Sequence, residues 1–337
     1  MRNRPFFSII MPTYNSETTI KKTLSSLQEQ TIYPSDVELL VIDGGSSDST
    51  LDIARCAGAT VLPNPDRVPE AAKRIGLNRA SGLFIIEMDS DEVLTSPGQL
   101  EKRKNALINH PDVQVMITKE LAPLGETGFY SAYSTRLGDP FSFFIYRADG
   151  DYAQAYRKNI IKKHEGEIIF HFSDGDLMPI ADGGTTTIGL DFIKKEFGHR
   201  MSDPSFAATM AAEVIRKTGK MMCLEDDRVI HNNPMSHKIY LKKLRFRVIN
   251  NIFESEKSGF TSREKTSSGK HNKKYLYIPY CLLIIPVLFD SIALCYKYKS
   301  ARYLEHISLS FYVLFLICGY MALKILGIKK ANTSYGK

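Results

Sequence analysis

Short apolar runs separated by polar stretches fill the first hundred residues of the chain. Four runs have the length of strands buried in a sheet, namely residues 6–11, 37–43, 59–63 and 83–88. Between them, apolar residues recur at helical spacing in segments that begin at Ser16, Asp48 and Pro69, with Ser16 as a candidate N-cap. Strands that alternate with helices in this way predict an α/β domain with a largely parallel sheet.

The later part of the chain follows different patterns. Residues 112–232 are irregular and rich in aromatic residues, which suits an acceptor-binding half built on the same sheet. Residues 254–274 are polar, rich in Ser and Lys and without periodicity, as linkers are. We therefore expect a catalytic domain over residues 1–250, a basic polar linker over 251–274 and two hydrophobic membrane helices within 275–330.

The two apolar stretches, 275–296 and 306–327, are each long enough to cross a hydrocarbon core as a helix, which takes about 20 residues. Buried core helices are an alternative, but no further domain remains to cover them. Pro279, Pro286 and Asp290 make the first stretch an imperfect span. The short basic loop between the stretches also opposes the positive-inside tendency, so a re-entrant or interfacial helix pair stays open.

Polar clusters follow three of the predicted strands, at the sheet edge where ligands of parallel sheets bind. In Asp89-Ser90-Asp91, two carboxylates one residue apart can hold a divalent cation that bridges a diphosphate. The alternative is a solvated turn or a helix cap. In Asp43-Gly44-Gly45, an acid that ends a strand before a glycine turn suits recognition of a base or ribose, or else a tight turn.

Taken in order, these segments resemble glycosyltransferase family 2, the inverting transferases with the GT-A fold. The resemblance covers about residues 6–95 and is carried by FFSIIMPTYNSETTIKKTLSSLQEQT, VELLVIDGGSSDSTLDIA and AAKRIGLNRASGLFIIEMDSDE. It implies a nucleotide-sugar donor, UDP- or GDP-linked, and Mn²⁺ or Mg²⁺ as cofactor. It also implies inverting transfer to a hydroxyl of a glycan or lipid-linked acceptor.

The same resemblance assigns residues to the donor site. Asp91 is expected to be the principal metal ligand, and Asp89 to contact ribose or metal. Lys73-Arg74-Ile75-Gly76 stands where the family usually has Arg-Asn-x-Gly, so Arg74 replaces the usual Asn. The residues expected to bind the nucleotide sugar are Pro12, Thr13, Tyr14, Asp43, Lys73, Asp89, Ser90 and Arg245.

The resemblance weakens in the second half of the chain. The family's acidic pair, often Glu-Asp, whose carboxylate takes the acceptor proton, is missing before the helix expected at 207–219. Asp203 is the first candidate for this base and Asp182 the second. His231 is a candidate metal or diphosphate contact, and Arg245, with Lys242, is expected to meet the diphosphate. The Gln and Trp of the QxxRW motif are absent, so processive synthesis is not expected.

Composition narrows the partners and the location. The net charge of +7 and the pI of about 9.0 suit an anionic membrane or a phosphate-bearing substrate. No nucleic-acid-binding module is recognisable, so no nucleic-acid partner is expected. Five cysteines without CxxC spacing and an N-terminal apolar run too short for a signal peptide favour a cytoplasmic catalytic domain. A bacterial or archaeal inner membrane is the expected site of anchoring.

Two rival functions stay open. A nucleotidyltransferase would need a glycine- and lysine-rich phosphate loop near the N-terminus, and MPTYNSETT supplies none. A membrane scaffold that has kept the fold and lost catalysis is kept open by the missing Glu-Asp pair.

Overall fold

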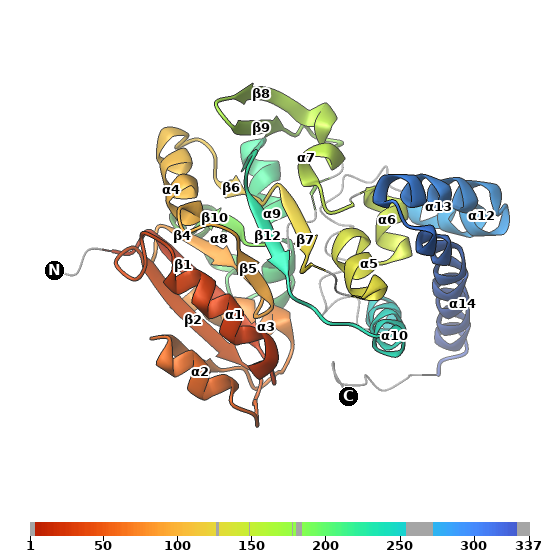
Figure 1. Cartoon of the computed structure of the whole chain (residues 1–337), viewed down its shortest axis with the longest axis horizontal. Helices are drawn as coiled ribbons and strands as arrows, with labels where there is room; N and C mark the ends of the chain where they lie inside the picture. Colours follow the sequence, from red (N-terminus) through yellow and green to blue (C-terminus); the bar gives the residue numbers. More distant parts are fainter. Residues whose placement is uncertain are drawn as a thin grey trace.

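The computed structural model describes residues 4–125, 128–147, 149–176, 178–179, 184–253 and 272–328. An α/β body built on a nine-stranded sheet occupies one end of the molecule, and a group of helices occupies the other (Figure 1). We call this second group the helical unit. It consists of α5 (Phe129–Leu137), α6 (Pro140–Tyr146), α10 (His237–Phe253), α12 (Tyr277–Leu282), α13 (Ile285–Tyr298) and α14 (Glu305–Ile325).

The main sheet has the strand order β3-β2-β1-β4-β10-β6-β11-β9-β8. Its first four strands are parallel, and β10 is antiparallel to both of its neighbours. A smaller sheet of order β5-β12-β7 lies beside it. The strands are β1 (Phe7–Thr13), β2 (Val37–Asp43), β3 (Thr60–Pro63), β4 (Phe84–Glu87), β5 (Glu92–Leu94), β6 (Val115–Met116), β7 (Glu120–Pro123), β8 (Ile160–His164), β9 (Glu167–His171), β10 (Thr186–Gly189), β11 (Lys220–Leu224) and β12 (Arg228–His231).

Helices cover both faces of the main sheet, which is why its central strands are apolar on both sides. In β1, Ile9 and Met11 belong to one core and Ile10 to the other. The first core packs against α1 and α4, and the second against α3, α8 and α9. The helices and 3-10 turns of the body are α1 (Glu17–Gln28), α2 (Thr50–Cys56), α3 (Pro69–Arg79), α4 (Gln99–Asn109), α7 (Tyr152–Ala155), η1 (Arg157–Asn159), α8 (Leu190–Phe197), η2 (Gly198–Arg200) and α9 (Pro204–Thr218).

Close packing of α3 on β1 explains one residue of the Lys-Arg-Ile-Gly segment. A side-chain carbon at Gly76 would lie 2.3 Å from Cγ2 of Ile10, so only glycine fits there. Arg74 reaches the loop before the helix and pairs with Asp66 at 3.6 Å. In this chain, Arg74 therefore ties that loop to α3.

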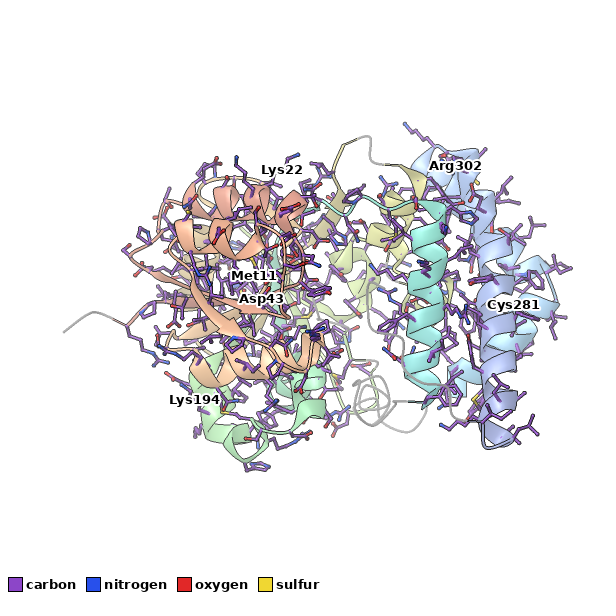
Figure 2. The ribbon with its side chains drawn as sticks, turned by 90° about the horizontal axis from the view of Figure 1, so that it is seen from below. Met11, Lys22, Asp43, Lys194, Cys281 and Arg302 are labelled. Atoms are coloured by element: carbon purple, nitrogen blue, oxygen red, sulfur yellow. The ribbon has the colours of Figure 1, made fainter. Side chains whose placement is uncertain are left out.

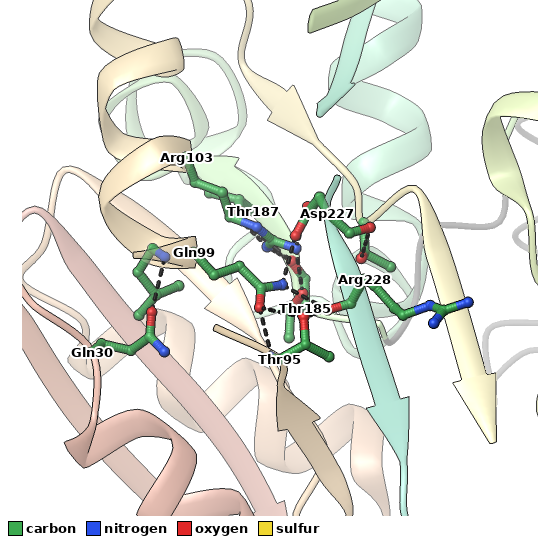
Figure 3. A network of polar contacts seen from close by, with 10 residues as sticks. Gln30, Thr95, Gln99, Arg103, Thr185, Thr187, Asp227 and Arg228 are labelled. Atoms are coloured by element: carbon green, nitrogen blue, oxygen red, sulfur yellow. Dashed lines mark hydrogen bonds and ion pairs between the residues drawn. The ribbon is translucent and has the colours of Figure 1, made fainter. Parts of the chain in front are cut away.

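A buried ion pair joins α4 to the strands behind it (Figure 3). Arg103 and Asp227 have no exposed side-chain surface and meet at 2.7 Å. Arg103 also donates to the carbonyl and hydroxyl of Thr185, at 2.5 and 2.6 Å. Gln99 donates to Asp227 at 2.6 Å. Burial raises the pKa of Asp227 despite Arg103. The network holds Thr185, which precedes β10, and Asp227, which precedes β12, in place.

The helical unit differs from the two continuous spans that the apolar stretches suggest. Residues 275–296 form no single helix: after the 3-10 turn η3 (Asn272–Leu276), α12 and α13 meet at an angle of 89°. Ile284 takes a φ of +61°, and Pro286, which lacks an N–H, starts α13. A second 3-10 turn, η4 (Ala301–Leu304), leads into α14, and Ala301–Ile325 together is long and apolar enough to cross a membrane.

Candidate functional site

The turn after β2 is built by the carboxylate that ends the strand. One oxygen of Asp43 accepts hydrogen bonds from the backbone N–H groups of Gly45 and Ser46, both at 2.8 Å. Gly45 has a φ of +90°, a conformation that favours glycine. The other oxygen accepts from the hydroxyls of Thr13, at 3.2 Å, and Ser46. Asp43 therefore holds both strand ends in place.

A cavity of about 510 Å³ opens beside this turn. Its size lies within the range of small-ligand pockets. Tyr14, 37% exposed, lies next to Gly44, where it can present a ring face to a ligand. Figure 2 labels Asp43, the last residue of β2, and Met11 of the neighbouring strand β1. The cavity is lined by Asp43, Gly44, Gly45, Leu51, Arg55, Val61, Leu62, Pro63, Asn64, Pro65 and Arg67.

The Asp89-Ser90-Asp91 turn follows β4, next to β1. The hydroxyl of Ser90 donates to that of Ser16 at 2.9 Å, and its carbonyl accepts from Thr23 at 3.0 Å. Ser16 stands at the N-cap position of α1, as its sequence indicates, but its side chain makes no capping hydrogen bond. It contacts Ser90 instead, so the turn is anchored on the first turn of α1.

His231 meets this turn because the smaller sheet pairs its strand with β5. In the antiparallel pairing of β12 with β5, His231 lies opposite Glu92. Its Nε2 is 3.2 Å from Oδ2 of Asp91, and its Nδ1 lies 3.0 Å from the hydroxyl of Thr135 on α5. Burial disfavours protonation of His231, but the Asp91 carboxylate outweighs it, so the pKa of His231 is raised. Two residues separated by 140 positions thus form one pair.

Glu92 is a site residue that the sequence motif did not single out. Its carboxyl is buried and accepts hydrogen bonds from the backbone N–H of Asp89, at 3.0 Å, and of Gly184, at 2.5 Å. Burial and the nearby Asp89 carboxylate raise the pKa of Glu92 to about 8. Glu92 therefore links the Asp-Ser-Asp turn to the entrance of β10.

Two basic residues expected at the donor site have partners elsewhere. Lys73 makes an ion pair with Glu87 of β4 at 3.1 Å, and both side chains are largely buried. Burial disfavours the charged form of Lys73, but Glu87 and Asp89 outweigh it and raise its pKa. Arg245 donates to the hydroxyl of Tyr320 on α14 at 2.7 Å, so its guanidinium faces the helical unit.

Lys243, two residues before Arg245 on α10, is a basic residue near the donor site that the sequence interpretation did not name. Burial and Arg247 lower the pKa of Lys243 to about 8, while Asp91 and Asp89 attract its charge. Two positions along a helix turn a side chain by about 200°, which explains why Lys243 and Arg245 point to different faces. Lys242 is exposed. Helical spacing in LKKLRFR, with Leu244 and Val248 buried, could have identified the correct face.

The first candidate base, Asp203, caps α9. Its carboxylate accepts from the N–H of Ser205 at 2.8 Å and pairs with Arg200 at 3.3 Å. Burial would raise the pKa of Asp203, but the Ser205 hydrogen bonds and Arg200 lower it. No hydrogen bond or ion pair found among the described residues joins Asp203 to Asp91 or His231. Asp182 lies outside the described residues.

Comparison with known proteins indicates the family. The sequence model for "Glycosyl transferase family 2" matches residues 8–170, which include the Asp43 turn and the Asp-Ser-Asp turn. This match supports a family 2 glycosyltransferase. An uncharacterised glycosyltransferase of Haemophilus influenzae is 34% identical over 119 residues, which are 32% of this chain and 45% of the relative.

A second relative is the GalNAc(5)-diNAcBac-PP-undecaprenol beta-1,3-glucosyltransferase of Campylobacter jejuni. It is 31% identical over 103 residues, which cover 27% of this chain and 31% of the relative. The chain therefore spans less than half the length of either relative. Among solved structures, the mannosyltransferase PcManGT of Pyrobaculum calidifontis, in complex with GDP-Man and Mn²⁺, matches 97% of this chain and 88% of its own, at 15% identity and a TM-score of 0.52. That likeness supports the predicted GT-A fold.

The side chains of the Asp-Ser-Asp turn and His231 suit a divalent cation. Among the described residues, no three His, Cys, Asp or Glu side chains cluster as a complete metal site. Asp91 and His231 nevertheless present a carboxylate oxygen and an imidazole nitrogen 3.2 Å apart. If His231 carries its single proton on Nδ1 and donates it to Thr135, Nε2, which now meets Asp91, can act as a ligand. Mg²⁺ in such enzymes is commonly held by one or two carboxylates together with substrate phosphates, so a partial protein site fits.

Proposed function

We propose that this chain is an inverting, metal-dependent glycosyltransferase that moves a sugar from a nucleotide-sugar donor to a hydroxyl group. The observation that carries the proposal is the pairing of Asp91 with His231, with the charge of Lys243 nearby, at the sheet edge that also holds the Asp43 cavity. A nucleoside and its diphosphate require such neighbouring sites, one for the base and one for the negative charge.

The donor nucleoside, from a UDP- or GDP-sugar, would lie in the cavity beside Asp43, with Tyr14 next to it. Thr13 donates to Asp43, which lines this cavity, and Pro12 pairs with Ile42 on the neighbouring strand β2. Mn²⁺ or Mg²⁺ at Asp91 and His231, with Asp89 adjacent, would supply Lewis-acid stabilisation of the diphosphate. Lys243 adds a positive charge that becomes more favourable as the diphosphate leaves. Ser90 contacts Ser16, and Lys73 pairs with Glu87 at the end of β4. Both contacts hold the Asp-Ser-Asp turn in place.

Positive charge develops on the sugar ring in the transition state, while the diphosphate gains negative charge. A carboxylate on the opposite face would take the acceptor proton and give inversion. We propose Asp203 as the first candidate for this base and Asp182 as the second. In the structure the Asp203 carboxylate accepts from Ser205 and pairs with Arg200, so it would have to leave these partners to take the proton.

The acceptor is proposed to be a lipid-linked glycan, and the catalytic body to face the cytoplasm at an inner membrane. The Campylobacter jejuni relative carries an undecaprenol-linked acceptor in its name, which supports a lipid carrier. The apolar helix Ala301–Ile325 supports a membrane location.

A donor panel tests the function. Purified full-length chain is incubated with UDP- and GDP-sugars, Mn²⁺ or Mg²⁺ and a membrane extract, and the products are read by mass spectrometry. We expect one donor to yield a nucleoside diphosphate and a glycosylated lipid. Release of pyrophosphate would indicate a nucleotidyltransferase, and no turnover of any donor would indicate a scaffold; either result would contradict the proposal.

A further inference from the structure

The helix α13 has apolar side chains on two opposite faces. Its inward face packs in the helical unit through Val287, Leu294 and the hydroxyl of Ser291, all buried. Its outward face repeats every three or four residues and is at least 53% exposed at each position. The outward residues are Ile285, Phe289, Ile292 and Tyr296. A helix that is apolar all round needs a second apolar partner besides the protein it packs on.

The corner between α12 and α13 extends this outward face. Four consecutive large apolar residues, Leu282 to Ile285, are each between 53% and 76% exposed at the 89° bend. α14 repeats the division: Leu309, Val313, Leu316 and Tyr320 are buried, whereas Phe315, Ile325 and Leu326 are more than 70% exposed. Figure 2 places Cys281 of α12 at the outer end of the molecule, away from Asp43.

Two polar side chains of α13 and α14, Asp290 and His306, point inward. Asp290, the only acid between residues 272 and 304, pairs with Arg147 at 2.5 Å and accepts from Tyr280 at 2.8 Å. His306, fully buried, contacts the hydroxyls of Tyr133 and Tyr280 at 2.5 and 3.2 Å. The outward faces of α12 and α13 therefore carry no acid. Five basic residues flank them in the same segment, namely Lys273, Lys274, Lys297, Lys299 and Arg302.

We propose that this outward face is a monotopic membrane-binding surface. The Leu282–Ile285 corner and the outward stripe of α13 enter one leaflet of an anionic bilayer, and no helix of residues 272–328 crosses it. Apolar side chains flanked by basic residues match acyl chains below anionic headgroups. Exposed tyrosines at the ends, Tyr275 and Tyr296, suit the interface between them. A second copy of the chain would bring equal positive charges toward these faces.

Helix lengths and packing argue against a transmembrane hairpin. α12 and α13 have 6 and 14 residues, about 9 and 21 Å at 1.5 Å per residue, whereas the hydrocarbon core is about 30 Å thick. α14 is long enough, but its inward stripe lies along α10. α10 carries five basic residues, which are rare inside hydrocarbon: Lys238, Lys242, Lys243, Arg245 and Arg247.

The membrane-binding surface would also bring a lipid-linked acceptor close to the donor site; this inference rests on the proposed function. α5 contacts both sides: Thr135 touches His231 of the donor site, and Tyr133 touches His306 of α14. One helix of nine residues therefore separates the donor site from the membrane-facing helices. An acceptor carried on a lipid in the same leaflet would be presented directly to the sugar.

Vesicle flotation tests the surface without any turnover. The full chain is mixed with phosphatidylcholine vesicles containing about 30% phosphatidylglycerol, or with neutral phosphatidylcholine alone. We expect wild-type protein to float with the anionic vesicles and a Leu283→Glu/Ile285→Glu variant to bind at least about tenfold less. The matched control is Ile108→Glu/Ile161→Glu, at exposed positions of α4 and β8, 55% and 60% exposed; it should float as wild type does. Circular dichroism verifies that both variants fold.

Equal flotation of the corner variant and wild type would overturn the proposal. So would a dimer that the corner substitutions dissociate while vesicles bind neither form. Flotation requires no donor, so the two proposals can fail separately. Loss of vesicle binding would contradict the membrane surface and not the transferase function, and absence of sugar transfer would contradict the transferase function and not the membrane surface.

Cysteine labelling distinguishes a monotopic surface from a span. Cys56 on α2 is exposed and reports on the catalytic body. In a Cys318→Ala background, Ala301→Cys adds a reporter to the turn before α14. We expect an impermeant maleimide to label both reporters from the same side of sealed inner-membrane vesicles. Labelling from opposite sides would show that α12–α13 crosses the bilayer and would refute the proposal.

Discussion

The helices α1 and α13 pack through similar inward stripes but differ on their outward faces. In α1, Ile20, Leu24 and Leu27 are buried, and the outward face carries exposed Lys21 and Lys22. In α13, both faces are apolar. The first pattern describes a helix between core and water, and the second a helix between core and another apolar phase. The two units differ in the same way. The outward face of α1 on the α/β body is polar and suits water, whereas the outward face of α13 on the helical unit is apolar.

The buried ion pair gives the largest stability effect expected in the α/β body. Arg103→Met leaves Asp227 charged and unpaired in the interior, so we expect the free energy of unfolding to fall by about 3–5 kcal/mol. Chemical denaturation measures it. Lys102→Met, which removes an exposed pair with Asp226, should cost less than about 1 kcal/mol. Equal losses for the two variants would show that the Arg103 network is not what fixes β10.

Substitutions of Lys243 and Arg245 test whether α10 of the helical unit contributes a positive charge to the donor site. Lys243→Met should lower kcat/KM about 10²-fold, because a charge that stabilises the leaving diphosphate is lost. Arg245→Met and Lys242→Met should change kcat/KM less than about threefold. Steady-state kinetics with the identified donor decides it. A larger loss for Arg245→Met would restore the sequence-based assignment.

The same lysine predicts a pH dependence. With a pKa of about 8, Lys243 is charged below that pH and loses its charge above it. Activity should therefore fall as pH rises through about 8, and Lys243→Arg should shift that fall upward because guanidinium stays protonated. An alkaline limb that is unchanged in Lys243→Arg would assign the fall to another group.

Thr135 connects α5 to the metal candidate His231. Thr135→Val keeps the side-chain shape and removes the hydroxyl that lies 3.0 Å from Nδ1. We expect about tenfold weaker activation by Mn²⁺ with little change in saturating kcat. Titration of activity against Mn²⁺ measures it, and Thr135→Ser, which keeps a hydroxyl, should recover most of the affinity. Unchanged activation in Thr135→Val would remove Thr135 from the site.

The outward face of α13 should contribute least to folding in water. Phe289→Ser removes an exposed apolar ring, so we expect the free energy of unfolding to change by less than about 0.5 kcal/mol. Leu24→Ser on the inward face of α1 should cost several times more, since that side chain is buried. A large loss for Phe289→Ser would mean that this face is already covered within the protein.

Much of the fold follows from the sequence where burial is two-sided. β1, β2 and β4 lie within two residues of the apolar runs that predicted them, because a central parallel strand is apolar on both faces along its whole length. The edge strand β3 also matches its run, although it is only partly buried. Contacts between distant segments are not visible in the same way. The smaller sheet that brings His231 to Asp91, and the α5 contact with Thr135, depend on the tertiary arrangement and have no local signal.

The site assignments divide along the same line. Asp43, Asp89 and Asp91 follow directly from strands, so their positions at one sheet edge could be predicted. The contacts of Lys73 and Arg245 could not be predicted, because their partners Glu87 and Tyr320 are decided by packing. Asp203 keeps its place at the start of a helix, yet its contacts are those of a cap. The identities of the base and of the metal ligands stay predictions.

The most direct test of the central claim is metal-dependent turnover in Asp91→Ala. The account predicts that Asp91→Ala lowers sugar transfer more than about 10³-fold with an unchanged unfolding temperature, because the carboxylate that pairs with His231 is lost. Asp52→Ala, at an exposed position on α2, serves as the control and should retain wild-type activity. Full Mn²⁺- or Mg²⁺-dependent turnover in Asp91→Ala would contradict the assignment of this site.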